Sequence, residues 1–104
     1  METNGAADAF GVVGDGTRRA IVLLLAERPQ AVVELATSLP VGRPAVSQHL
    51  KILKDAGLVE EEAVGTRRVY RLNEVGLLAL RDQLDTFWRR ALQTFQEIAE
   101  EENP

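Results

Sequence analysis

The residues best suited to chemistry lie between Gly42 and Val59, in the sequence GRPAVSQHLKILKDAGLV. A helix turns by about 100° per residue, so this segment divides into two faces. The apolar face carries Val46, His49, Leu50, Ile52 and Leu53. The polar face carries Arg43, Pro44, Ser47, Gln48, Lys51 and Lys54. Such a helix can pack on a core while it presents hydrogen-bond donors and cations to a ligand.

The polar face offers the groups that pair with double-stranded DNA. A guanidinium can bind guanine and a carboxamide can bind adenine in a major groove. Four residues are therefore expected at the base edges: Arg43, Pro44, Ser47 and Gln48. The flexible ammonium groups of Lys51 and Lys54, on later turns, are better placed to hold phosphates. The alternative is a solvated helix face without a ligand.

A β-hairpin is predicted directly after this helix. Val59–Val64 and Arg67–Leu72 are expected to be two short strands around Gly65-Thr66, a turn signal between β-branched residues. Thr66, Arg67 and Arg68 lie at its tip, where they can contact the DNA backbone or a minor groove. A solvated hairpin is the alternative. The three glutamates at 60–62 would repel phosphate unless they face away or pair with Arg67, Arg68 and Arg71 across the hairpin.

Three helices are expected before the polar helix. The first covers about residues 6–13, and the second starts at Asp15 as N-cap and stops at Arg28, before Pro29. The second helix is apolar on every side from residue 20 to 26, which favours a buried central helix. A third covers about residues 31–38 and offers Val32, Val33, Leu35, Ala36 and Leu39 to the core.

The polar helix itself has clear boundaries. Gly42 is acceptable as its N-cap and Pro44 in its first turn, and Gly57 is suited to a left-handed exit. The helix is expected to end at about Ala56.

The last helix should carry more apolar surface than one small core can cover. Asn73 can cap it, and its stripe contains Leu77, Leu80, Leu84, Phe87, Trp88, Ala91, Leu92, Phe95 and Ile98. A second copy of the chain would cover this stripe, together with Phe10 of the first helix. An apolar effector lodged at such a seam is a less favoured alternative.

The order of elements predicts a mostly α fold with a small β-wing, a winged helix-turn-helix with terminal dimerisation helices. One domain would span residues 1–104, with the helix-turn-helix at 31–56, the wing at 59–72 and the terminal helices at 6–13 and 74–100. A core this small is marginal alone, which again favours a dimer.

The net charge of −4 and pI of about 5.0 argue at first against nucleic acid. The last ten residues, however, hold four glutamates and no base, so residues 1–94 carry 12 basic and 12 acidic groups. From Arg43 to Leu72 there are six basic and four acidic groups. A local basic face therefore survives in an acidic protein.

Residue types that the chain lacks exclude several kinds of site and classes of protein. Without cysteine there are no disulfides, thiolate metal sites or cysteine nucleophiles. The only histidine, His49, lies in the apolar arc and is expected to be packed in the core with a local hydrogen bond. Arg18 or Arg19, at the start of the second helix, can either reach a DNA phosphate or form an ion pair with an acidic residue such as Glu34. No set of residues in the sequence is suited to enzyme catalysis. No apolar run approaches the ~18 residues of a membrane span, and no targeting pattern opens the chain, so a cytoplasmic protein is expected.

Three blocks make the chain resemble the ArsR-type bacterial winged helix-turn-helix repressors over about residues 8–85. They are GDGTRRAIVLLL at 14–25, PAVSQHLKILKDAGLV at 44–59 and GTRRVYRLN at 65–73, and the middle block is the specific one. The resemblance implies dimers paired through the first and last helices. It also implies a helix from about residue 43 in the major groove, wing tips on the flanking backbone, and repression until an effector binds.

The chain departs from that family pattern in two ways. Gly16 replaces the usual proline after the aspartate, which should slightly weaken the start of the second helix. Metal-sensing members carry cysteines on the third helix, or Asp and His ligands on the last helix. Here the third helix reads AVVELATS, and the last has Asp82 and Asp85 but no histidine. No metal and no cofactor are therefore expected, beyond a weak site of oxygen ligands.

The favoured hypothesis is a homodimeric repressor that binds an inverted-repeat operator and does not respond to metal. The alternatives are a protein-interaction module that no longer reads an operator and a repressor released by an apolar ligand at the dimer seam.

Overall fold

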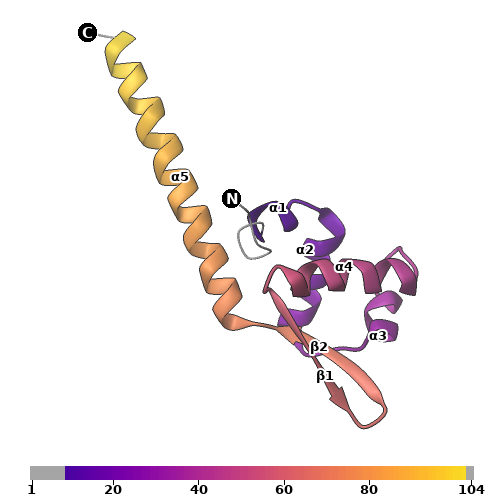
Figure 1. Cartoon of the computed structure of the whole chain (residues 1–104). Helices are drawn as coiled ribbons and strands as arrows, with labels where there is room; N and C mark the ends of the chain where they lie inside the picture. The colour runs from indigo at the N-terminus through magenta and orange to yellow at the C-terminus, as the bar shows by residue number, and fades with distance from the viewer. Residues whose placement is uncertain (1–8, 103–104) are drawn as a thin grey trace.

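The computed structural model describes residues 9–102, which form five helices and a two-stranded hairpin (Figure 1). The elements are α1 (Ala9–Val12), α2 (Gly16–Glu27), α3 (Val32–Thr37), α4 (Arg43–Asp55), β1 (Val59–Val64), β2 (Arg67–Leu72) and α5 (Glu74–Glu102). The mostly α fold with a small wing is confirmed. Of the predicted first helix, residues 6–8 lie outside the described part of the chain.

The helix ends follow the residues that predicted them. The Asp15 carboxylate accepts a hydrogen bond from the Arg18 backbone N–H at 3.0 Å, and α2 ends at Glu27 with Arg28 as C-cap. Gly42 is the N-cap of α4. The chain leaves α4 through Gly57, whose φ of +81° is a conformation that other residues adopt at a cost.

The core lies where α2, α3 and α4 meet the start of β1. Its fully buried side chains are Ile21, Leu35, Val46, Leu50, Leu53 and Leu58. Two expectations are wrong here. Leu23 of α2 is 68% exposed, and Val33 of α3 is half exposed, because only one side of each helix meets the core. An all-apolar sequence therefore does not bury every face of α2.

The wing is an antiparallel hairpin in which Val59 pairs with Leu72 and Val64 with Arg67. Gly65 makes the turn with a φ of +64°. The hairpin is tied to the segment after α2 by two backbone hydrogen bonds between Gln30 and Tyr70, of 3.0 and 2.8 Å. These two backbone hydrogen bonds fix the wing to the helical body.

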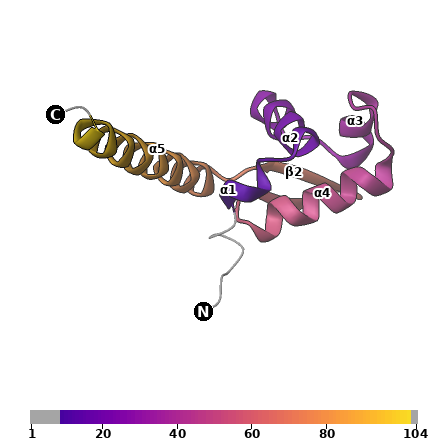
Figure 2. The same ribbon diagram turned by 90° about the horizontal axis from the view of Figure 1, so that it is seen from above.

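The last helix, α5, leaves the body and extends well beyond it (Figures 1 and 2). Asn73 caps α5 by accepting from the Gly76 backbone N–H at 3.1 Å. Leu80, which is predicted for the dimer seam, is 8% exposed and packs against the core of its own chain. Within residues 9–102, no helix is long and apolar enough to cross a membrane.

Candidate nucleic-acid interface

The nine residues predicted to contact DNA are all exposed, and they come from α4 and the wing. They are Arg43, Pro44, Ser47, Gln48, Lys51, Lys54, Thr66, Arg67 and Arg68. The apolar face of α4 is buried through Val46, Leu50 and Leu53. Burial of that face is what turns the opposite face outward, as the helical spacing predicts.

The start of α4 and the tip of the wing share one open groove. Arg43 and Ser47 line it from α4, and Arg67 and Arg68 line it from β2, with the first residues of α3 forming the remaining wall. A second hollow on the other side of Ser47 is lined by Lys51 and Lys54, among others. Residues that are far apart in the sequence therefore line two hollows that meet at Ser47.

The cations of this surface differ in their partners. Within residues 9–102, the side chains of Arg43, Ser47 and Gln48 form no ion pair or hydrogen bond. In contrast, Lys51 Nζ lies 3.0 Å from Asp55 Oδ2 on the same helix. The groups expected at base edges are open, whereas Lys51, which is predicted to hold a phosphate, has a carboxylate neighbour.

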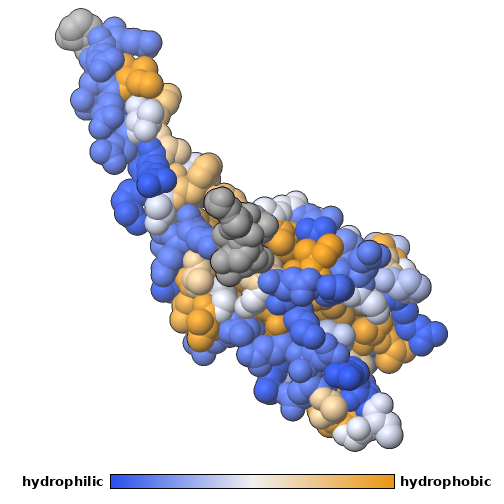
Figure 3. Space-filling view, in the orientation of Figure 1, coloured by the Kyte–Doolittle hydropathy of each residue, from blue (hydrophilic) through white to orange (hydrophobic). Residues whose placement is uncertain are grey.

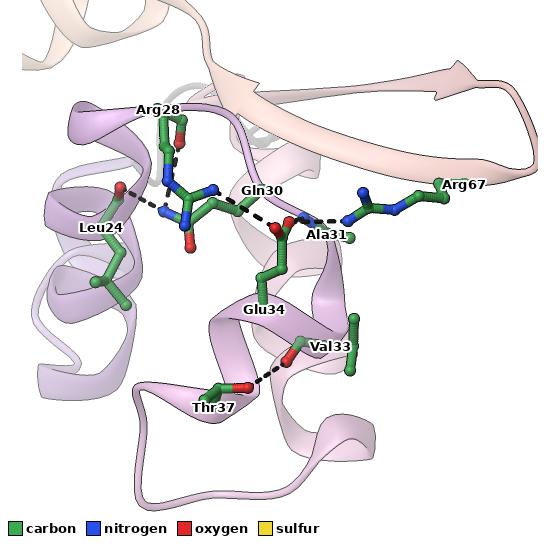
Figure 4. Close-up of polar contacts among 8 residues, drawn as sticks. All are labelled: Leu24, Arg28, Gln30, Ala31, Val33, Glu34, Thr37 and Arg67. Carbon is green, nitrogen blue, oxygen red and sulfur yellow. Dashed lines mark hydrogen bonds and ion pairs between the residues drawn. The ribbon is translucent and has the colours of Figure 1, made fainter.

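One carboxylate, Glu34, connects α3 to the wing (Figure 4). Its Oε1 accepts from the Ala31 backbone N–H at 2.8 Å and lies 2.9 Å from Arg67 NH2, while Oε2 lies 3.6 Å from Arg28 NH1. The hydrogen bond from Ala31 holds the pKa of Glu34 below its ordinary value, and the charges of Arg67 and Arg28 act in the same direction. Arg67 is therefore held by a fixed anion.

A second carboxylate, Glu61, connects α4 to the wing. Its Oε1 lies 2.8 Å from Lys54 Nζ and its Oε2 lies 3.0 Å from Arg68 NH1. The hydrogen bond from Lys54 holds the pKa of Glu61 below its ordinary value and raises that of Lys54. Arg71 pairs with Glu60 and Glu62. The expected pairing of the glutamates is thus present for Arg68 and Arg71, whereas Arg67 pairs with Glu34 instead.

His49 is half-buried and hydrogen-bonded, as expected, but its bond is not local in sequence. Arg18 Nε donates to His49 Nδ1 at 3.2 Å, and Arg18 NH1 donates to the Val12 carbonyl at 3.1 Å. Arg19 donates to the carbonyls of Val13 and Gly14. The expected pairing of Arg18 or Arg19 with Glu34 is therefore wrong. Arg18 instead joins α1, α2 and α4.

The apolar stripe of α5 is largely exposed in the single chain, most clearly in its second half (Figure 3). Trp88 is 60% and Phe95 70% exposed, and Leu92 and Ile98 are exposed by about half. Leu77 and Leu84 are half-buried against the core, and Ala91 is exposed.

Near the body, two aromatic rings of the stripe contact each other, and one of them also contacts α1. Phe10 of α1 meets Phe87 edge to face, with ring centroids 5.2 Å apart, and Phe87 meets Trp88 at 5.6 Å. Phe10 and Phe87 flank an open hollow that also includes Asp82, Thr86 and Arg90. Phe10 and Phe87, which are both predicted for the dimer seam, thus contact each other between α1 and α5 of the single chain.

Sequence reasoning missed the residues that hold the wing in place. Gln30 is 3% exposed, and its Nε2 donates to the Leu24 carbonyl at 2.8 Å (Figure 4). Pro29, which ends α2 and extends the chain before Gln30, is the only sequence signal of this bridge. Of the described residues, no group of three His, Cys, Asp or Glu could hold a metal ion.

Comparison with known proteins agrees with this geometry. A family model described as bacterial regulatory protein, arsR family, matches residues 15–61. The HTH-type transcriptional regulator Rv2034 of Mycobacterium tuberculosis is 57% identical over 94 residues, which cover 90% of this chain and 88% of that protein. The arsenical resistance operon repressor of Escherichia coli is 33% identical over 90 residues, or 86% of this chain and 77% of that protein.

A solved structure agrees with this family and with the fold. The homodimeric winged helix-turn-helix DNA-binding domain of Mb0332 from Mycobacterium bovis, a possible ArsR-family regulator, is 33% identical with a TM-score of 0.65, over 79% of this chain and 78% of that one. The chain belongs to the arsR family of bacterial regulatory proteins, and it is a DNA-binding transcriptional regulator with a winged helix-turn-helix fold rather than an enzyme.

Proposed function

We propose that this protein is a homodimeric, sequence-specific repressor that binds an inverted-repeat operator and does not respond to metal ions. The observation that carries the proposal is the groove shared by Arg43 and Ser47 of α4 and by Arg67 and Arg68 of the wing. A surface that combines open hydrogen-bond donors with cations at its edge matches the division of DNA contacts into base reading and phosphate holding.

The proposed contacts fall into two groups. Arg43, Pro44, Ser47 and Gln48 enter the major groove, where Arg43 binds guanine and Gln48 binds adenine. Lys51 and Lys54 hold phosphates beside α4, while Thr66, Arg67 and Arg68 contact the backbone from the wing tip. The exposure of all nine side chains supports these roles.

The dimer is proposed from the exposed half of the α5 stripe and from the homodimeric M. bovis relative. Phe10, Leu77, Leu84, Phe87, Trp88, Ala91 and Phe95 are the proposed interface residues, with Leu80 supporting them from the core. Two copies related by a two-fold axis would present two α4 helices about one turn of DNA apart, ~34 Å. The two-fold axis requires an operator with inverted half-sites, and the spacing sets the distance between their centres.

Repression is supported by the name of the E. coli relative, which is an operon repressor. A regulator of this size represses most simply by occupying DNA that the transcription machinery needs.

Independence of metal is supported by the ligand inventory. The chain has no cysteine and one histidine, and the ring of that histidine accepts a hydrogen bond from Arg18. We expect the affinity for DNA to stay the same when zinc or nickel is added. Titration of DNA with the protein in the presence of each metal, and of a chelator, checks this. A reversible, metal-dependent loss of affinity would contradict it.

The experiment that tests the repressor proposal is selection of DNA fragments from a random pool with the purified protein, followed by footprinting. We expect an inverted repeat with two protected half-sites about one helical turn apart. Protection of a single half-site would contradict the dimeric arrangement. No protection even at low salt would favour the alternative, a winged-helix module that binds protein.

A further inference from the structure

We propose that Glu34 and Glu61 compete with DNA phosphates for the cations of the wing and α4, and so lower the affinity for duplex DNA of any sequence. The inference rests on the proposed function, because it assigns Arg67, Arg68 and Lys54 to phosphate contacts.

The Glu34 carboxylate is anchored, so it does not move with the Arg67 side chain when Arg67 turns toward DNA. The Ala31 backbone N–H donates to Oε1 at 2.8 Å, the same oxygen that lies 2.9 Å from Arg67 NH2. Arg28 adds a second cation at 3.6 Å from Oε2. A carboxylate anchored at the start of a helix stays in place when Arg67 moves. An approaching phosphate must therefore replace this carboxylate as the partner of Arg67 and also approach its negative charge (Figure 4).

Glu61 holds two of the proposed phosphate contacts at once. Its side chain is only 17% exposed, and its two oxygens lie 2.8 Å from Lys54 Nζ and 3.0 Å from Arg68 NH1. Both cations remain half exposed or more, so phosphate can reach them. Partial burial of the carboxylate reduces its screening by solvent, which strengthens its hold on the cations.

The carboxylate partners lie beside the cations proposed to hold phosphates and not beside the residues proposed to read bases. Among residues 9–102, Arg43 and Gln48 have no carboxylate partner, whereas Lys54, Arg67 and Arg68 each have one. The competition therefore acts on the contacts that every DNA sequence offers. A cation already paired with a carboxylate also contributes less to the salt dependence of binding, which counts the phosphates neutralised.

The test is the Glu34→Gln variant, which removes the charge but keeps an oxygen that can accept from Ala31, since glutamine also caps at this position. We expect it to bind selected and scrambled duplexes about two- to fivefold more tightly, as the loss of one exposed ion pair implies. The slope of log affinity against log salt should steepen by up to about 0.9. Glu61→Gln should act in the same direction. Glu100→Gln, at the far end of α5, is the control for the change in net charge.

A double-variant cycle separates competition from a general effect on folding. In the Arg67→Ala background, the gain from Glu34→Gln should be smaller than in the wild type, because the contested cation is absent and only the repulsion between the carboxylate and the phosphate is relieved. Thermal unfolding of each variant shows whether the fold is intact.

Three results would overturn the inference while leaving the proposed function standing. They are unchanged or weaker binding by both Glu34→Gln and Glu61→Gln, an equal gain from Glu100→Gln, and a gain from Glu34→Gln that is undiminished in the Arg67→Ala background. If the wild-type protein binds no duplex at low salt, the proposed function and the inference both fail.

Discussion

At the scale of single residues, the surface that we propose to face DNA combines side chains without a partner and side chains paired with a carboxylate. Arg43 and Gln48 project without a partner among the described residues, while Arg67 is held by Glu34 and Lys54 by Glu61. The polar face of α4 could be predicted from helical spacing alone. The carboxylate partners could not be, because Glu34 lies 33 residues from Arg67 and meets it only through the tertiary fold.

The two carboxylates should make the fold sensitive to acid. The pKa values of Glu34 and Glu61 both lie below the ordinary 4.5. Their contribution to stability is therefore complete above the unfolded-state pKa and is lost as the pH falls through the lowered folded-state values. We expect the thermal midpoint to fall below about pH 4.5, and to fall less in a Glu34→Gln/Glu61→Gln variant. Identical pH profiles for this variant and the wild type would disprove the link.

At the scale of elements, the close approach of α5 to the exit of α4 fixes where α5 leaves the body. A Cβ at Gly76 would clash with the carbonyl oxygen of Gly57, and backbone atoms cannot give way cheaply. We expect Gly76→Ala to lower the free energy of unfolding by about 1–3 kcal/mol. Gly11→Ala is the matched control, because its Cβ would meet nothing within 4 Å. Chemical denaturation compares the two, and equal stability would show that the contact relaxes freely.

Most element boundaries could be predicted because local residues determine them. Asp15 caps α2, Gly42 starts α4, Gly57 ends it, and the hairpin turns at Gly65, as expected. The side of α2 that meets the core could not be predicted, since Leu23 lies in an unbroken apolar run. Which side is buried depends on where α3 and α4 pack, and the sequence of α2 alone does not carry that information.

The same limit applies to the wing. Its turn at Gly65-Thr66 is signalled by the sequence, but the backbone pairing of Gln30 with Tyr70 joins segments 40 positions apart. Only the assembled fold brings these two backbones together.

At the scale of the whole molecule, the second half of α5 carries an exposed apolar stripe, which we propose a second copy of the chain covers. The molecule measures 66 × 29 × 25 Å, and its long dimension reflects the extension of α5 away from the body. The last helix, predicted to end at about residue 100, continues through the acidic end of the chain to Glu102.

We expect Phe95→Glu to weaken the dimer and leave the monomer folded, because Phe95 is 70% exposed in the single chain. Burial of such a side chain is worth about 1.5–3 kcal/mol, and a dimer buries two. The dissociation constant of the dimer should rise roughly a hundredfold or more. Sedimentation equilibrium measures it, and the emission of Trp88, the only tryptophan, reports the same change. Gln96→Glu is the control on the neighbouring position, and an equal effect of both variants would argue against the stripe as interface.

The measurement that tests the central claim most directly is the preference for operator over scrambled DNA in wild type, Gln48→Ala and Lys51→Ala. If α4 reads bases, Gln48→Ala should remove about 1–3 kcal/mol of preference and leave binding to scrambled DNA unchanged. Lys51→Ala should weaken binding to both DNAs alike, with a shallower salt slope. A Gln48→Ala variant that keeps the full preference, while Lys51→Ala loses it, would contradict the assignment of base reading to this face of α4.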